Sequence, residues 1–183
     1  MLRCAVQLAI MNNSRPVIRL HKAAGCIGDY MRNEKINLSN TAKGVIASFR
    51  EIISYKEIHY QQIFDRNVII NSDEDLVREA IWVLVENAVS NTNDGGYIKA
   101  FIRMDNTTAQ FEIGYSEKSI SYNVVPDIFD RYTCDGDTGI DSDSPGPGSD
   151  IASARQAMEK LGGHASICKS GGDEVLYSLE FPL

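Results

Sequence analysis

The chain has 183 residues, 43% of them hydrophobic, which suits one domain of ordinary size and argues against a disordered chain. Its formal net charge of −7, without a compensating basic cluster, disfavours nucleic acid or an anionic membrane surface as the main partner. No apolar run reaches about 18 residues and the four cysteines are scattered without zinc spacing, so we expect a cytoplasmic protein with reduced thiols.

The first part of the chain is predicted to be mainly helical. Residues 1–32 carry apolar side chains at helical spacing, and the polar stretch 33–40 interrupts that pattern. A second helix is expected over residues 41–56. Residues 62–70 end in the β-branched run Val68-Ile69-Ile70, which predicts a strand.

Residues 76–92, LVREAIWVLVENAVSNT, predict an amphipathic helix. The three acids that precede it, at positions 73–75, suit the positive end of a helix dipole. Asn87 follows Glu86 on the penultimate turn of this helix. A carboxamide there is either a buried structural polar group or a ligand for a hydrated metal ion, and the residues alone leave both interpretations open.

The second part of the chain is predicted to be rich in strands, because turn residues separate short apolar segments. We expect, in chain order, a turn at 93–96, a hairpin of strands 97–104 and 108–115, a long irregular loop at 134–150, a helix at 151–161 ended by Gly162-Gly163, and two strands around Gly171-Gly172.

The ordered set of motifs resembles the ATP-binding domain of sensor histidine kinases. The helix 76–92 is similar to that family's N box, and residues 126–132, PDIFDRY, are similar to its F box. Residues 146–163 resemble its second glycine box with the following helix, and the terminal VLYSLEFPL resembles its closing strand. The resemblance, over roughly residues 14–183, implies an α+β fold: a two-layer α/β sandwich (the Bergerat ATP-binding fold) with helices on one face of a mixed sheet.

The resemblance also divides the chain into two domains. Residues 1–34 resemble the second helix of a histidine kinase dimerisation domain, which would precede the sandwich; its first helix and the phosphoacceptor motif are not recognisable. Residues 35–183 resemble the ATPase domain. This organisation implies a homodimer through the N-terminal helix and a response regulator or a partner kinase as the protein partner.

Asn87 is the residue that the resemblance places at the metal. In the family, the N-box asparagine coordinates the Mg²⁺ that bridges the triphosphate oxygens, so Asn87 is expected to bind both metal and nucleotide. Val83 stands where the family usually has a polar residue. Ser90 and Asn91 stand where it often has a lysine and an aromatic side chain, so Asn91 is expected beside the nucleotide without supplying a cation.

The first glycine box departs further from the family pattern. Tyr115 stands where the family's aspartate accepts the adenine amino proton, and Glu117 and Ser119 stand where it has glycines. A phenol cannot replace a buried carboxylate acceptor at the same reach, and side chains at the glycine positions exclude close approach of the base. The ring of Tyr115 could itself fill the adenine slot.

The second glycine box is partly preserved. Gly146 and Gly148 stand where the first two glycines belong and are expected at the nucleotide, whereas Asp150 replaces the third. An aspartate there would satisfy the helix amides that otherwise hold phosphate. Residues 133–153 hold five aspartates and no lysine or arginine, a charge that would repel a triphosphate.

Three hypotheses follow for function. The first is a two-component signal transduction module, a pseudokinase whose histidine kinase-like ATPase domain has a degenerate site and binds ATP weakly or not at all. The second is an active histidine kinase catalytic domain with ATP and Mg²⁺ as cofactors. The third is a histidine phosphotransferase that uses His21, although His21-Lys22 lacks the acidic neighbour and the proline of the family's phosphoacceptor motif.

Overall fold

The computed structural model describes residues 32–116, 151–169 and 174–183. Its elements in chain order are β1 (Glu34–Asn37), α3 (Leu38–Ala47), α4 (Arg50–Tyr55), β2 (His59–Phe64), β3 (Ile69–Ser72), α5 (Glu74–Asn91), β4 (Tyr97–Met104), β5 (Thr108–Ser116), α6 (Ala152–Lys160), β6 (His164–Lys169) and β7 (Glu174–Pro182). Residues 1–31 of the predicted N-terminal helix, the F-box motif and the loop 134–150 lie outside the described residues.

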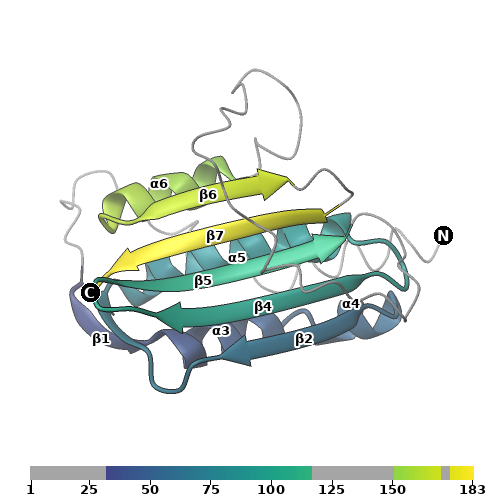
Figure 1. The fold of residues 1–183 in the computed structure, drawn as a ribbon, viewed down its shortest axis with the longest axis horizontal. Helices are drawn as coiled ribbons and strands as arrows, with labels where there is room; N and C mark the ends of the chain where they lie inside the picture. Colours follow the sequence, from purple (N-terminus) through teal and green to yellow (C-terminus); the bar gives the residue numbers. More distant parts are fainter. Residues whose placement is uncertain (1–31, 117–150, 170–173) are drawn as a thin grey trace, which may run out of the picture. The chain divides into compact units, whose positions relative to one another are not determined.

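A mixed sheet forms one layer of the fold. Five strands lie in the order β2-β4-β5-β7-β6; β2 runs parallel to β4, and the other neighbours are antiparallel. The helices α3, α5 and α6 cover one face of this sheet (Figure 1). The predicted two-layer α/β sandwich with helices on one face is therefore confirmed.

The predicted hairpin is present as β4 and β5. The alternation along β5 places Ala109, Phe111 and Ile113 in the core under the helices, and directs Gln110 and Glu112 to the other face. Gly95, in the turn before β4, has φ +71°, and Gly162, after α6, has φ +68°. The predicted turn at 93–96 and the predicted helix end at Gly162-Gly163 are therefore present.

The helix expected over residues 41–56 is two helices. α3 begins earlier than predicted because the Asn37 side chain accepts a hydrogen bond from the Asn40 amide and caps the helix. The chain then turns at Ser48 and Phe49. Phe49 enters the core, with a ring centroid 4.6 Å from that of Trp82, so tertiary packing interrupts the helical pattern.

The strand expected within residues 62–70 is also two elements, β2 and β3. Asn67, at φ +57°, lies in the turn between them. β1 was not predicted, because its polar sequence EKIN has no clear alternation. It forms by antiparallel pairing with β3, which sets Ile36 opposite Ile70 in the core.

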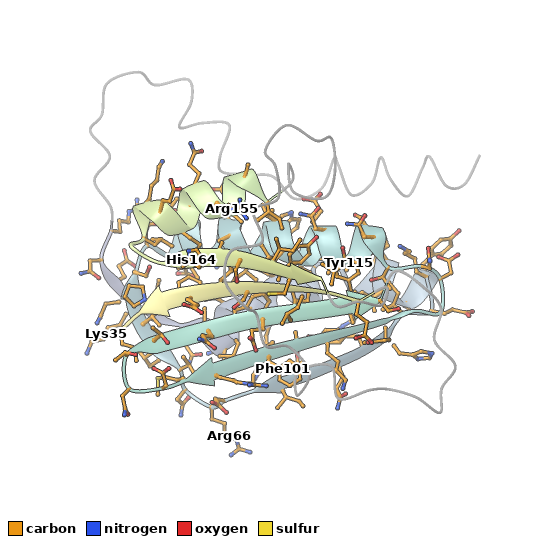
Figure 2. The ribbon with its side chains drawn as sticks, turned by 45° about the horizontal axis from the view of Figure 1, so that its top comes forward. Lys35, Arg66, Phe101, Tyr115, Arg155 and His164 are labelled. Carbon is orange, nitrogen blue, oxygen red and sulfur yellow. The ribbon has the colours of Figure 1, made fainter. Side chains whose placement is uncertain are left out.

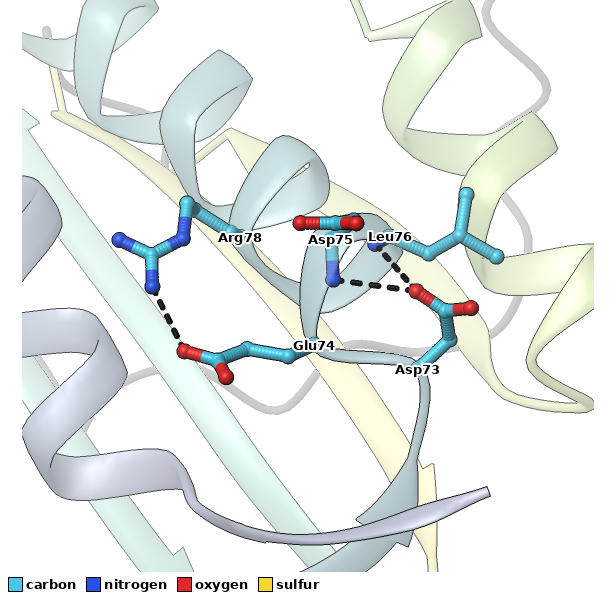
Figure 3. A network of polar contacts seen from close by, with 5 residues as sticks. All are labelled: Asp73, Glu74, Asp75, Leu76 and Arg78. Atoms are coloured by element: carbon cyan, nitrogen blue, oxygen red, sulfur yellow. Dashed lines mark hydrogen bonds and ion pairs between the residues drawn. The ribbon is translucent and has the colours of Figure 1, made fainter. Parts of the chain in front are cut away.

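The start of α5 explains why the acidic stretch precedes this helix. The Asp73 carboxylate accepts hydrogen bonds from the amides of Asp75, at 3.0 Å, and Leu76, at 3.3 Å (Figure 3). Glu74 in the first turn forms an exposed ion pair of 2.6 Å with Arg78. The predicted acidic first turn is thus confirmed, with Asp73 as the cap.

Asp73→Ala is expected to lower the free energy of unfolding by about 1–2 kcal/mol, because α5 loses its N-cap. The same carboxylate also accepts a hydrogen bond from the Arg32 amide, at 3.0 Å. Urea unfolding measures the change, and Glu74→Ala is the matched control because its exposed ion pair contributes only about 0.5 kcal/mol. Equal losses in the two variants would contradict the assigned cap.

Glu112 lies on the sheet face opposite the helices, and the Oε2 atom of its carboxylate is buried. Its Oε2 atom has no hydrogen-bond partner within the described part of the chain, and it lies 4.0 Å from Nε of Arg103. Burial raises the pKa of Glu112, Arg103 lowers it in part, and Glu180 raises it further. The ionised form of Glu112 is therefore disfavoured in the folded protein.

Glu112→Gln is expected to stabilise the protein at pH 7. Because the folded-state pKa of Glu112 is raised above 4.5, its contribution to stability is fully present below that pH and is lost as the pH rises through the folded-state value. The glutamine variant does not lose this stability as the pH rises. Its higher free energy of unfolding relative to the parent should therefore disappear below about pH 4. Urea unfolding at both pH values checks this; an equal advantage at both would contradict the explanation.

Two expectations from composition can be compared with the described residues. None of the described helices is long and apolar enough to cross a membrane. Cys168 on β6 is disulfide-bonded, so the expectation of reduced thiols is wrong at this position. The other three cysteines lie outside the described residues.

Candidate functional site

Asn87 and Tyr115 lie at the same end of the sandwich. α5 ends at Asn91, and the short turn after it leads directly into the start of β4 (Figure 1). Antiparallel pairing sets Ile98, at the start of β4, opposite Tyr115, near the end of β5. The fold therefore brings the C-terminal part of α5 and Tyr115 to the same end of the sandwich.

Asn87 is a buried carboxamide on the core side of α5. Only 9% of its surface is exposed, and its Nδ2 atom has no hydrogen-bond partner among the described residues. A buried donor without a partner costs about 1–3 kcal/mol, and such groups usually have a functional or solvent-mediated explanation. An amide oxygen is a suitable ligand for Mg²⁺, so Asn87 fits the predicted metal position.

The described neighbours of Asn87 on α5 supply little else for a phosphate group. Val83, one turn earlier, is half-buried and apolar, so it cannot order the waters of a metal ion. Ser90 and Asn91 are exposed at the end of the helix and carry no charge. Asn91 is thus placed near the predicted site, but it provides no cation for a triphosphate.

Lys56 is a cation at this end that the sequence did not point to. It follows α4, and its Nζ donates hydrogen bonds to the carbonyl oxygens of Val89, at 2.8 Å, and Ser90, at 3.3 Å. Burial lowers the pKa of Lys56, and Asp94 offsets part of that shift. The ammonium therefore caps the negative end of α5, which engages two of its three donors.

Tyr115 does not fit the role of an adenine acceptor. Its side chain is fully buried, and it belongs to the core between β5 and the helices. Its hydroxyl lies 3.3 Å from that of Tyr177 on β7, and the ring centroids are 5.7 Å apart (Figure 2 shows Tyr115). A phenol in this position offers no carboxylate as a hydrogen-bond acceptor.

The remaining predicted site residues lie outside the described residues. These are Gly146, Gly148, Glu117, Ser119, Asp150 and His21. Within residues 32–116, 151–169 and 174–183, no three His, Cys, Asp or Glu side chains gather into a metal-binding group. Asn87 is therefore the one predicted ligand whose surroundings the structure describes, and a single amide oxygen would hold Mg²⁺ only together with phosphate and water oxygens.

Comparisons with known proteins agree with this geometry. Residues 72–183, more than half of the chain, match the family described as histidine kinase-, DNA gyrase B- and HSP90-like ATPase. The sensor protein KdpD of Clostridium acetobutylicum is 25% identical over 115 residues, which is 63% of this chain. The match spans 13% of the length of KdpD.

Solved structures of histidine kinases share the fold. The nucleotide-free catalytic domain of ThkA superimposes with a TM-score of 0.62 at 19% identity, over 83% of this chain and 97% of that one. The mycobacterial sensor histidine kinase MprB gives a TM-score of 0.60 at 16% identity, over 82% and 97% of the two chains. The chain therefore belongs to the histidine kinase-, DNA gyrase B- and HSP90-like ATPase family and has the fold of a histidine kinase catalytic domain.

Proposed function

We propose that this chain is a two-component signalling module whose histidine kinase-like domain has a degenerate nucleotide site and binds ATP weakly or not at all. The fully buried ring of Tyr115, paired with Tyr177, is the observation that carries this proposal. In this interpretation the chain acts as a pseudokinase, through its shape and its partners.

The energetic argument has two parts. Losing one charge-assisted hydrogen bond to the adenine amino group costs about 1.5–3 kcal/mol, which weakens binding by about 10- to 150-fold. The buried ring would also exclude the adenine base sterically, because the base could enter only if Tyr115 left its contact with Tyr177. Both effects act on the same position, so we expect no binding at micromolar nucleotide.

An active catalytic domain is the second candidate. The buried Nδ2 of Asn87 without a described partner supports it, since a bound nucleotide with Mg²⁺ and its waters could satisfy this carboxamide. A histidine phosphotransferase that uses His21 remains a third hypothesis, which the described residues do not address.

We also propose a partner and an organisation. ThkA has been solved in complex with the response regulator TrrA, and that ThkA chain matches with a TM-score of 0.64 at 16% identity, over 98% of this chain and 48% of ThkA. By analogy, a response regulator or a partner kinase would dock on this module in the cytoplasm. The helical dimerisation segment expected over residues 1–34 would end before β1, which begins at Glu34, and residues 35–183 would form the ATPase-like domain.

Thermal unfolding with and without nucleotide tests the proposal. A site with a Kd of about 10 µM would gain about 2.7 kcal/mol at 1 mM Mg-ATP, which shifts the Tm by several degrees. We expect no shift relative to Mg²⁺ alone. A shift of several degrees with Mg-ATP would favour the active catalytic domain instead.

A further inference from the structure

Part of the outer sheet face, the face opposite the helices, is buried. The alternation along β4 and β7 directs Tyr97, Lys99, Phe101 and Leu176 to this face, away from the core under the helices. These four residues, the covered patch, have exposed fractions of only 4%, 8%, 7% and 4%. No described helix or strand lies over this face (Figure 1). A lysine on an uncovered sheet face keeps its ammonium and much of its stem in water, so a part of the chain outside the described residues covers the patch.

The rest of the same face is open. Ile63 on β2 is paired with Phe101 and has 51% of its surface exposed. Arg103, two residues after Phe101 on β4, and His164, at the start of β6, are also exposed. The covered patch therefore lies at the end of the sheet where β5 finishes and β7 begins.

Cys168 provides a covalent link at the border of the covered patch. It lies on β6 opposite Leu176 of β7, so the two side chains face the same side of the sheet. Cys168 is disulfide-bonded, and the other cysteines of the chain, Cys4, Cys26 and Cys134, lie outside the described residues. The disulfide therefore joins this border to a segment beyond the described residues.

We propose that residues 117–134 pack on the covered patch and that Cys134 forms the disulfide with Cys168. The composition of this segment suits an apolar surface, because seven of its residues are Ile, Val, Phe or Tyr. Residues 135–150, in contrast, hold only one such residue, Ile140. Packing of the apolar side chains of 117–134 on the patch removes apolar surface from water on both sides of the contact.

The segment begins at the covered end of the sheet. β5 ends at Ser116, and Gly114, Leu176 and Cys168 are register partners on three adjacent strands. Since neighbouring strands lie about 4.8 Å apart, Cys168 lies about 10 Å from Gly114. The chain from Ser116 to Cys134 can extend over about 60 Å, so it is long enough to cross the patch and reach Cys168.

Cys134 is favoured over the two N-terminal cysteines for two reasons. Cys134 belongs to the same compact unit as Cys168, residues 32–183, whereas Cys4 and Cys26 belong to the unit of residues 1–31. Residues 117–150 also connect β5 with α6, so both ends of this segment are held by the sandwich. Closing a disulfide loop within such a segment costs less chain entropy than closing the longer loop from Cys4 or Cys26.

The contact is independent of the proposed function. Asn87 lies on the core side of α5, whereas the covered patch lies on the opposite face of the sheet. Neither of the two experiments that follow uses nucleotide, so their failure would leave the proposed degenerate site untouched.

Mapping the disulfide in the full chain is the first test. The protein is purified without reductant, its free thiols are blocked with N-ethylmaleimide, and it is digested with trypsin. Cys168 falls in the tryptic peptide 161–169 and Cys134 in the peptide 132–155, so mass spectrometry should show these two peptides joined.

Two serine variants complete the mapping. Cys134→Ser should leave Cys168 free to react with N-ethylmaleimide, whereas Cys26→Ser, the matched control, should leave Cys168 bonded. In the parent, a Cys168 peptide joined to a peptide that holds Cys4 or Cys26, or a Cys168 peptide joined to none, would overturn the proposal.

A pair of substitutions on the outer face tests the packing without a cysteine. Leu176→Glu should lower the Tm by at least about 5 °C, because it places a carboxylate beneath residues 117–134. Ile63→Glu, on the open part of the same face, should change the Tm by about 2 °C or less. If Leu176→Glu does not fold, Leu176→Gln and Ile63→Gln give the same comparison with smaller shifts. Equal shifts at the two positions would contradict a segment packed over Leu176.

Discussion

Gly163→Ala is expected to lower the free energy of unfolding by about 3 kcal/mol, one of the largest effects of a single methyl group in this protein. Gly163 links α6 to β6. A Cβ atom there would collide with the carbonyl oxygen of Glu180 and would come within 2.6 Å of Cε of Met158. The side chain of Met158 can move away from the added Cβ atom. The carbonyl group of Glu180 cannot move as easily, because it belongs to β7, where Glu180 is paired with His164.

Gly44→Ala is the matched control for this prediction. Gly44 lies within α3, and an added Cβ would meet no atom within 4 Å. The same substitution should therefore stabilise the protein, by about 0.5–1 kcal/mol, because alanine is the better helix former. Urea unfolding of both variants measures the two changes. A decrease in the free energy of unfolding of less than about 1 kcal/mol for Gly163→Ala would show that the β7 backbone shifts at little cost, which would contradict the tight packing at Gly163.

Tyr115→Ala is expected to cost about 3–5 kcal/mol, because a fully buried aromatic ring leaves a cavity between β5 and the helices. This prediction separates two interpretations of the position. A ring in the core is tightly packed, so its removal costs the full amount. A ring lying in an open nucleotide pocket would cost much less, since solvent could replace it.

Tyr115→Phe provides the control. It keeps the ring and removes only the hydroxyl that lies 3.3 Å from that of Tyr177, so the loss should be about 1 kcal/mol. Guanidinium unfolding measured for both variants decides the matter. A loss of less than about 1 kcal/mol for Tyr115→Ala would contradict the view that this ring fills the slot.

Much of the fold was predictable because several of its elements carry their own local pattern. The helical recurrence in 76–92, the turn at 93–96 and the alternation after it yielded α5, β4 and β5 within a few residues. β1 was missed, and β2 was not separated from β3, because the sequences of β1 and β2, EKIN and HYQQIF, have little apolar alternation. Pairing with β3 and β4 makes them strands, and single-sequence patterns do not contain that information.

The site was predictable only where the resemblance supplied a position. Asn87 and Tyr115 come to the same end of the sandwich; their roles at a nucleotide stay predictions. The sequence does not predict which residues contact this end of the sandwich, because those residues come from distant segments. Tyr177 contacts Tyr115 from β7, and Lys56 contacts the end of α5 from the end of α4.

Isothermal titration calorimetry of Mg-ATP into the full chain, with Asn87→Ala as the control, tests the central claim most directly. With Tyr115 in the core at the position that the proposal assigns to the adenine acceptor, we predict no binding heat up to millimolar nucleotide, and no difference between the parent and the variant. Micromolar to sub-millimolar binding that Asn87→Ala abolishes would contradict the degenerate site and would identify an active catalytic domain.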